Sequence, residues 1–340
     1  MSTAVYVQTN DADRNEVIAF RRSDNGALAP LGRYETGGRG TGEPHLPSQN
    51  SMVLGDDGRS LLVANAGSNE VSLFAVEADG LRLADVAGSG GSTPTSVAIS
   101  GALVYVLNNG SANVAGFTID GGRLIELDGS SRPLSSEGAD PAQVAFSPDG
   151  RTLAVTERGT DSITAYAIDD RGYAGGPATI ASNGKTPYGF DFAGDGAMIV
   201  TEAFGGAVGA AAASSYAITA AGQVTPVTAT VRDTRSEVCW AAVTNDGRTA
   251  YVTNFGDGTI SSYAIGNGGS LELRDPVAGS TRLGEKGVRD EAITRDGRYL
   301  YAIDADSRQV FGWSIGHDGS LASVGAFDGL PATVAGLAAS

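Results

Sequence analysis

The segment DPAQVAFSPDGRTLAVTERGTDSITAYAID, residues 140–169, decides the fold of this chain. Three short runs rich in valine, alanine and aromatic residues alternate in it with polar turns, and the first turn contains Asp149-Gly150. An Asp-Gly pair between apolar runs is a strong hairpin signal, because glycine adopts positive φ without steric cost. The segment therefore predicts antiparallel strands that belong to one sheet.

The same unit recurs seven times along the chain. In every copy a β-rich run ends in a polar residue, a turn follows, and a second β-rich run begins. These polar residues are Asn10, Asn65, Asn108, Glu157, Glu202, Asn254 and Asp304. Asp-Gly turns precede the first run at Asp57-Gly58, Asp149-Gly150, Asp195-Gly196, Asp246-Gly247 and Asp296-Gly297. A repeat of ~40–50 residues with four strands is typical of a β-propeller blade.

These repeats predict an all-β fold, a single seven-bladed β-propeller domain over residues 1–340 with four antiparallel strands per blade. The two ends of the chain predict how the ring closes. VYVQTN, residues 5–10, reads as the second strand of a blade, whereas LPATVAGLAAS, residues 330–340, resembles the opening of a unit and then stops. We therefore expect the C-terminal strand to complete the N-terminal blade, which leaves few exposed strand edges.

Composition excludes several classes of partner. The formal net charge of −16 argues against nucleic acid, whose phosphates need basic protein surfaces, and against anionic membranes. The single cysteine, Cys239, cannot form an internal disulfide, and the N-terminal residues contain no apolar leader. We expect a cytoplasmic, monomeric protein that acts on a small-molecule substrate, without nucleic-acid or membrane partners.

One of the two histidines lies where propellers commonly bind ligands. His45 belongs to GRGTGEPHLPSQNS, residues 38–51, the loop that enters the second predicted blade at the mouth of the central channel. His317 lies in a turn on the opposite face, where we expect only a surface residue. His45 is therefore a candidate catalytic residue, and the alternative is a solvated loop histidine.

The polar residue that ends each second run offers two further candidates. Asn and Asp fit such turns because their short side chains bond the local backbone, whereas Glu157 and Glu202 fit them poorly. Two carboxylates near one channel mouth are candidates for general acid and base. A ring of such oxygens is equally suited to Ca²⁺, although no other cofactor or metal site is predicted. Solvated turn residues are the third interpretation.

Residues at the start of the predicted innermost strands, and arginines beside them, are candidates for substrate binding. Tyr188 and Trp240 are suited to form the wall of a small-molecule pocket, and arginine binds carboxylate or phosphate. The candidates are Arg39, Gln49, Gln143, Arg158, Tyr188, Trp240, Arg289 and Asp290. Channel packing or surface exposure is the alternative for each of them.

Units such as residues 140–169 resemble the lactonase-type seven-bladed propellers, which include 6-phosphogluconolactonases and propeller-type 3-carboxymuconate-cyclising enzymes. The resemblance covers nearly the whole chain and implies that Glu157 matches the family's glutamate after a second strand. Two positions depart from the family. Thr95 and Ser96 lie in the third unit where its histidines are expected, and Phe255 replaces an arginine of the sixth unit.

The resemblance implies an enzyme that hydrolyses a lactone, or that cyclises or isomerises a related unsaturated carboxylic acid, at the channel mouth. Glu157 would then be the acid or base, with Arg39, Arg158 or Arg289 holding an anionic group. The departures favour an alternative, a non-catalytic propeller that binds a small molecule or a protein. A metal-dependent lactonase with a Ca²⁺ site is the third hypothesis.

Overall fold

In the computed structural model, which describes residues 3–340, each Asp-Gly pair of the repeats forms a tight turn between two antiparallel strands. The glycine of every such pair has positive φ, for example 68° at Gly150 and 69° at Gly247. The aspartate stabilises the turn as well, because its Oδ1 accepts the backbone N–H two residues later, as Asp149 does from Arg151. The prediction that the Asp-Gly pairs form hairpin turns is therefore confirmed.

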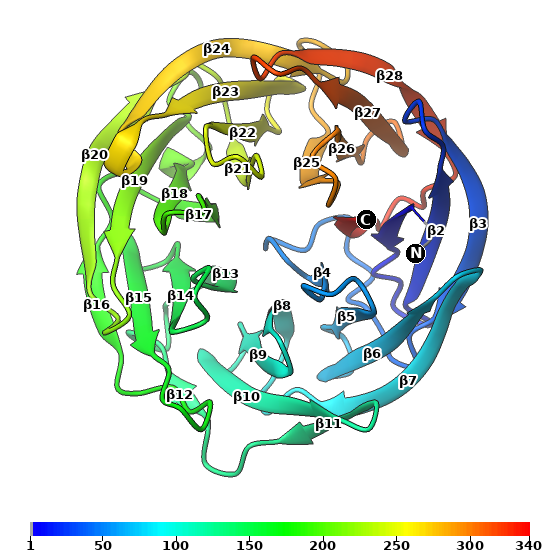
Figure 1. Ribbon diagram of the computed structural model, residues 1–340, viewed down its shortest axis with the longest axis vertical. Coiled ribbons are helices and arrows are strands. Elements are labelled where there is room, and N and C mark those ends of the chain that lie inside the picture. The colour runs from blue at the N-terminus through cyan, green and yellow to red at the C-terminus, as the bar shows by residue number, and fades with distance from the viewer. Residues whose placement is uncertain (1–2) are drawn as a thin grey trace.

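The strands form seven antiparallel sheets, which are the blades of a ring (Figure 1). From the innermost strand outward, blade 1 consists of β29 (Ala335–Ala339), β1 (Ala4–Gln8), β2 (Glu16–Arg22) and β3 (Leu28–Glu35), and blade 2 consists of β4 (Met52–Leu54), β5 (Ser60–Asn65), β6 (Glu70–Glu77) and β7 (Gly80–Gly88). Blade 3 consists of β8 (Pro94–Ser100), β9 (Leu103–Asn108), β10 (Asn113–Asp120) and β11 (Arg123–Glu126). Blade 4 consists of β13 (Pro141–Phe146), β14 (Thr152–Glu157), β15 (Ser162–Ala167) and β16 (Ala178–Ala181). A short extra strand, β12 (Arg132–Pro133), pairs with β10 in blade 3.

Blades 5–7 follow the same order: β17 (Pro187–Phe192), β18 (Ala197–Glu202), β19 (Ala212–Ile218) and β20 (Val224–Arg232); β21 (Val238–Val243), β22 (Thr249–Asn254), β23 (Thr259–Ile265) and β24 (Leu271–Ser280); and β25 (Val288–Ile293), β26 (Tyr299–Asp304), β27 (Gln309–Ile315) and β28 (Leu321–Asp328). Two single-turn 3₁₀ segments, Phe204–Gly206 and Asn267–Gly269, complete the secondary structure of the described residues. No helix within residues 3–340 is long and apolar enough to cross a membrane. The prediction of a seven-bladed, four-stranded propeller is confirmed.

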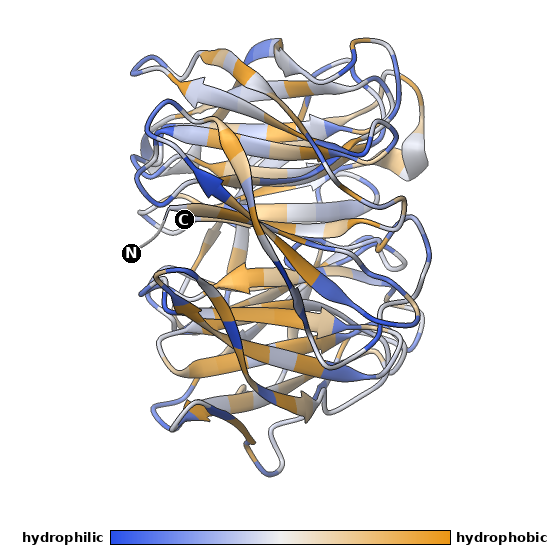
Figure 2. Cartoon of the chain, turned by 90° about the vertical axis from the view of Figure 1, so that its right-hand side faces the viewer, coloured by the Kyte–Doolittle hydropathy of each residue, from blue (hydrophilic) through white to orange (hydrophobic). Residues whose placement is uncertain are grey.

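The chain closes the ring as expected, because β29 at the C-terminus becomes the innermost strand of blade 1. It pairs antiparallel with β1, with Val7 opposite Leu337 and Tyr6 opposite Ala338. Figure 1 shows the C-terminus near the channel, and the view in Figure 2 places it on one face, where the Ser340 N–H donates to the Ala4 carbonyl. We call this the lower face; it also carries the Asp-Gly turns. The upper face carries the loops that enter the innermost strands.

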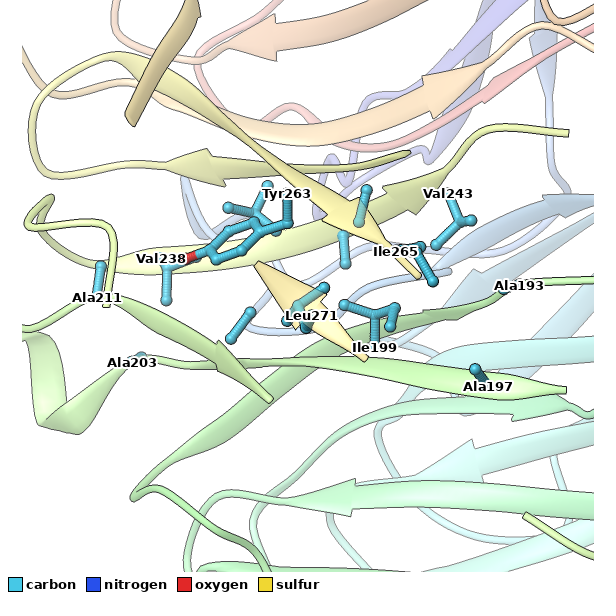
Figure 3. Close-up of a cluster of buried hydrophobic side chains, with 14 residues drawn as sticks. Ala193, Ala197, Ile199, Ala203, Ala211, Val238, Val243, Tyr263, Ile265 and Leu271 are labelled. Carbon is cyan, nitrogen blue, oxygen red and sulfur yellow. The ribbon is translucent and has the colours of Figure 1, made fainter. Parts of the chain in front are cut away.

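Seven of the clusters of buried apolar side chains lie between adjacent blades, one at each interface. Figure 3 shows the cluster between blades 5 and 6, where Ile199 of blade 5 lies beside Leu271 and Ile265 of blade 6. The strands are apolar on both sides because each blade is covered by two neighbours. Hydrophilic residues gather instead in the loops of the two faces (Figure 2).

Buried tyrosines link adjacent blades through their hydroxyl groups. Tyr105 and Tyr301, on second strands, donate to the carbonyls of Gly172 and Gly26 in the following blade, at 2.9 and 2.6 Å. Tyr263, on a third strand, donates to a carbonyl of the preceding blade. A buried phenol needs such a partner, so these bonds fix the spacing of the blades while the rings fill the core.

Replacing Leu337 by alanine tests the closure. Leu337 is buried between blades 7 and 1, and its loss from the closing strand should lower the free energy of unfolding by about 2–5 kcal/mol. Urea denaturation measures this change. Leu283→Ala, at a position that is 67% exposed, is the matched control and should change stability by less than about 0.5 kcal/mol. Equal stabilities of the two variants would contradict the closure by β29.

Candidate functional site

The loop of residues 38–51 is exposed on the upper face at residues 43–45 and then runs into the channel. In Figure 1 the segment before β4 reaches toward the centre of the ring. Ser48 and Gln49 are buried, and each bonds a different blade: the Ser48 hydroxyl donates to the Thr95 carbonyl at 2.6 Å, and the Gln49 N–H donates to the Ala142 carbonyl at 3.0 Å. The loop is therefore held by the innermost strands of blades 3 and 4.

Two glutamine side chains bridge the middle of the channel. Gln49 reaches β21 in blade 6, where its Nε2 donates to the Ala241 carbonyl at 2.8 Å and its Oε1 accepts the Ala241 N–H at 3.0 Å. Gln143 bonds the N–H and carbonyl of Phe190 on β17 in the same way. These amides satisfy the free backbone edges of innermost strands. In the structure, both predicted substrate-binding glutamines are bonded to the protein's own backbone.

Above the glutamines lies a cluster that we call the upper mouth: His45, Arg158, Tyr188, Trp240, Phe255 and Arg289. The His45 ring lies edge-on to Trp240, with ring centroids 6.4 Å apart, and Tyr188 lies 5.6 Å from Trp240. The Arg158 guanidinium stacks over the Tyr188 ring at 5.0 Å. Four of the predicted site residues besides His45 therefore meet at one place, although they come from blades 4 to 7.

His45 joins the aromatic and cationic parts of the upper mouth. Arg289 Nη1 lies 3.1 Å from His45 Nδ1, and the Tyr188 hydroxyl lies 3.4 Å from Nε2. Since a guanidinium can only donate, Nδ1 accepts from Arg289, and Nε2 carries the ring proton. Arg289 also donates to the Pro44 carbonyl, so the same guanidinium holds the loop and the imidazole.

The surroundings keep His45 uncharged. Part of the residue's surface is exposed on the upper face, yet crowding by the surrounding chain, and then the charges of Arg289 and Arg158, lower the pKa of His45 to about 4. The imidazole is consequently neutral at pH 7 and is a proton acceptor rather than a cation. His45 is thus an exposed loop residue whose ring also contacts Arg289 and Trp240, and its catalytic role stays a prediction.

The two arginines differ in how far their charges are balanced. Arg158 forms an ion pair with Asp140, with Nη2 2.6 Å from Oδ1. Arg289 is buried, stacks over Phe255 at 5.1 Å and forms no ion pair within the described residues. In the sequence, Phe255 is notable only because it departs from the family pattern. In the structure its ring packs against the guanidinium of Arg289, which comes from the next blade.

Asp290 follows Arg289 on β25 and is buried. Its Oδ1 accepts the Gly336 N–H at 2.9 Å, which connects the site to the closing strand. Burial raises the pKa of Asp290 to about 7, opposed by the Arg289 charge and by the bond from Gly336. Arg39 lies elsewhere: its side chain is exposed, and its N–H donates to the Ser68 hydroxyl.

Glu157 and Glu202 lie between blades rather than in the upper mouth. Glu157 is fully buried and accepts from the Ser135 N–H at 3.2 Å, from the Ser135 hydroxyl, and from Thr160 and Thr164. Ser135 follows blade 3, so the carboxylate joins two blades. These contacts occupy the acceptor positions of the side chain. The hydrogen bonds of the Glu157 side chain do not reach the upper mouth, and its catalytic role stays a prediction.

Glu202 has the same environment in blade 5. It accepts from the Gly184 N–H at 2.7 Å, from the Ser214 hydroxyl and from Thr230. Burial is the main reason why the pKa of Glu202 is raised. The interpretation of both glutamates as solvated turn residues is wrong, because neither side chain reaches solvent.

The repeated polar position has a structural function in several blades. Asn65 donates to the hydroxyl of Ser72, seven residues later on the third strand, and Asn254 donates to Ser261 at the same spacing. These side chains bond within their own and neighbouring blades instead of converging. Residues 3–340 contain no group of three or more His, Cys, Asp or Glu side chains arranged to hold a metal ion.

Sequence reasoning missed two carboxylates farther down the channel, Asp191 and Glu291. Both lie on innermost strands and line a cavity of about 330 Å³ below the glutamines. The sequence does contain a signal for these two residues, because charged side chains are unusual on innermost strands that are otherwise apolar. The run Arg289, Asp290, Glu291 is the most obvious example.

Comparisons with known proteins agree with this architecture. The family model described as "Lactonase, 7-bladed beta-propeller" matches residues 13–130, 126–203 and 202–333. A candidate 6-phosphogluconolactonase from Bacteroides uniformis has a similar structure, with 20% sequence identity, a TM-score of 0.76, and coverage of 98% of this chain and 99% of its own. The periplasmic gluconolactonase of Pseudomonas aeruginosa is 17% identical, with a TM-score of 0.72 and coverage of 100% and 99%.

A third similar structure, from Desulfotomaculum acetoxidans, is described as functionally unknown; it is 15% identical, with a TM-score of 0.74 and coverage of 100% and 99%. No curated protein sequence matches the chain. Sequence identities this low show a common fold and leave the reaction to be argued from the site.

Replacing Glu157 by glutamine tests its structural role. The variant keeps one oxygen acceptor but loses the second, so the free energy of unfolding should fall by about 1–3 kcal/mol in urea denaturation. Glu137→Gln, at an exposed position two residues after Ser135, is the control and should be neutral. Unchanged stability of the Glu157 variant would contradict the structural interpretation.

The raised pKa of Asp290 predicts a pH dependence of stability. Between about pH 4 and about pH 7 the folded chain keeps this proton while the unfolded chain releases it, so the free energy of unfolding falls as pH rises. Asp290→Asn lacks this titrating group. As pH rises from 4 to 7.5, the free energy of unfolding of the variant should therefore increase relative to that of the wild type by about 1–4 kcal/mol. Urea denaturation at several pH values checks this, with exposed Asp120→Asn as the control. Parallel pH profiles for Asp290→Asn and the wild type would contradict the assignment.

Proposed function

We propose that this chain, which belongs to the lactonase family of seven-bladed β-propellers, hydrolyses a lactone that carries a carboxylate or phosphate group, and that it does so at the upper mouth. One observation carries the proposal: the neutral imidazole of His45 lies between two arginine side chains and an aromatic wall. The similar structures named as lactonases support the reaction class.

Arg289 and Arg158 supply the anion specificity. Arg289 forms no salt bridge with the described residues, so an incoming carboxylate or phosphate would meet a guanidinium that no carboxylate holds directly. Arg158 already holds Asp140 and adds a second positive charge beside the Tyr188 ring. In a chain with a net charge of −16, this local positive charge would also attract an anionic substrate.

Substrate binding activates His45 in this scheme. The anion takes up hydrogen bonds of Arg289, which releases His45 Nδ1 from its present donor at 3.1 Å. It also offsets the arginine charges, which add to burial in lowering the pKa of His45 to about 4, so that pKa rises and the imidazole becomes a stronger base.

The reaction then needs one proton acceptor. His45 removes a proton from a water molecule whose oxygen attacks the lactone carbonyl carbon. The ring C–O bond breaks, and the imidazolium returns the proton to the leaving alkoxide, so a lactone and water give a hydroxy acid. The Tyr188 hydroxyl, 3.4 Å from Nε2, orients the ring. Glu157 and Glu202 stabilise the blades in this scheme.

Kinetics of variants test the assignment. His45→Gln should reduce kcat by about 10²–10⁴, the usual contribution of a general base. Arg289→Met should raise KM at least about tenfold for 6-phosphogluconolactone and leave KM for uncharged gluconolactone nearly unchanged, because only the former offers an anion. Arg123→Met, at an exposed position of β11, is the matched control. Acid release in a pH-stat measures all of these rates.

The pH profile gives a second check. The kcat/KM of the wild type should fall below about pH 4, the pKa of His45 in the free protein, whereas the acidic limb of kcat should lie at higher pH. Normal turnover by His45→Gln would contradict the mechanism, and loss of turnover by stable, folded Glu157→Gln would restore the glutamate as the base. Turnover lost with EDTA would favour the metal-dependent hypothesis. Binding without turnover would favour the non-catalytic one.

A further inference from the structure

The lower half of the channel contains a cavity that the proposed reaction does not use. It has a volume of about 330 Å³, is bounded by Gln49 and Gln143, and extends to Asn245 beside the Asp246-Gly247 turn on the lower face. Small-molecule sites commonly begin at about 300 Å³. The bridging glutamines lie between this cavity and the upper mouth, so the two are separate sites.

The charge of this cavity has one sign. Most of its lining residues are apolar, with Met52, Val243 and Ile293 among them, but polar atoms make up more of its surface than apolar atoms do. Among the described residues that line it, only Asp191 and Glu291 ionise as acids. No lysine, arginine or histidine within the described part of the chain lines it. A cavity with two carboxyl groups and no cation favours a positively charged occupant.

Glu291 is the least satisfied of these groups. The residue is 6% exposed, and neither carboxyl oxygen has a hydrogen-bond partner within residues 3–340. Asp191, by contrast, accepts the N–H groups of Val243 and Phe192, each at 2.8 Å. A buried acid without a partner destabilises a fold, and proteins retain such groups mainly at functional sites.

We propose that this lower cavity binds a small organic cation, an ammonium group on a compact apolar body, with the ammonium against Glu291 and the apolar body against the channel wall. Asp191 supplies a second negative charge from the neighbouring wall. A metal ion fits less well, because Ca²⁺ takes six to eight oxygen ligands and the described residues hold no cluster of three acidic or histidine side chains here.

Electrostatics add a measurable consequence. Burial, and then the negative charge of Asp191, raise the pKa of Glu291 well above its usual range, so Glu291 holds its proton more tightly than an exposed glutamate does. Tyr251 on β22 is the other titratable group that interacts with Glu291. An ammonium ion favours the ionised carboxylate, and its binding should therefore release up to one proton from the protein.

Calorimetry with cyclohexylammonium on the full chain tests the proposal. Titration at pH 7 in two buffers of different ionisation enthalpy should give a Kd below about 1 mM and a net proton release. Cyclohexanol and cyclohexanecarboxylate, which share the apolar body, should bind at least about tenfold more weakly, because only the cation is complementary to Glu291. Since binding is measured, failure of lactone turnover at the upper mouth does not affect this result.

Variants locate the site. Glu291→Gln should weaken cyclohexylammonium binding at least about tenfold and abolish the proton release, whereas Glu272→Gln, at an exposed position of β24, should change neither. Asp191→Asn retains Glu291 and should weaken binding less. It provides a second variant should the first not fold.

Three results would overturn the proposal. The first is no binding of cyclohexylammonium by the wild type up to about 10 mM, and the second is equal binding of cyclohexanol. The third is tight binding of cyclohexylammonium by the wild type without proton release, together with unchanged affinity in Glu291→Gln and Asp191→Asn. This result would show that the cation binds elsewhere on this acidic protein.

Discussion

Apolar packing between adjacent blades is the interaction on which the rest of this structure depends. No blade has a core of its own; each of the seven clusters belongs to two blades, so none is complete until both neighbours are in place. The last interface, between blades 7 and 1, requires the two ends of the chain to meet. Strand β29 provides this closure, and it also carries the Gly336 N–H that bonds Asp290 at the candidate site. Stability and site geometry therefore share one strand.

The same packing explains where polar groups occur. Because the flat sides of the blades are apolar, polar side chains are confined to the loops, the channel and the gaps where one blade meets the next. Glu157 and Glu202 occupy such gaps and are satisfied there by hydroxyl groups. The channel instead presents unpaired backbone edges of the innermost strands, and Gln49 and Gln143 bond these edges. Gln49 from the loop and Gln143 from β13 thereby lie between the arginines of the upper mouth and the carboxyl groups of the lower cavity.

Charge separates these two sites on an otherwise acidic protein. The upper mouth gathers Arg158 and Arg289 around a neutral histidine, which suits an anionic substrate. The lower cavity holds two carboxyl groups without a cation, which suits the opposite kind of ligand. The net charge of the chain argues only against nucleic-acid and anionic-membrane partners. It does not reveal the positive upper mouth, because Arg158 and Arg289 come from blades 4 and 7 and reach the same site only in the closed ring.

The sequence by itself determined the number of blades, their strands and turns, and the closure of the ring, because these follow from local signals repeated every 43 to 55 residues. It also placed His45, Tyr188, Trp240, Arg158 and Arg289 at the correct end of the channel, since strand order assigns each loop to a face. Only the tertiary structure decided which of these side chains touch. The contact of His45 with Arg289 spans 244 positions, and the Gln49 bridge to Ala241 spans 192. The glutamates that looked functional proved to be buried between blades, and the unpartnered Glu291 became visible only once the surrounding strands were in place. Periodicity is a property of the chain, whereas contacts across the channel arise from closing the ring.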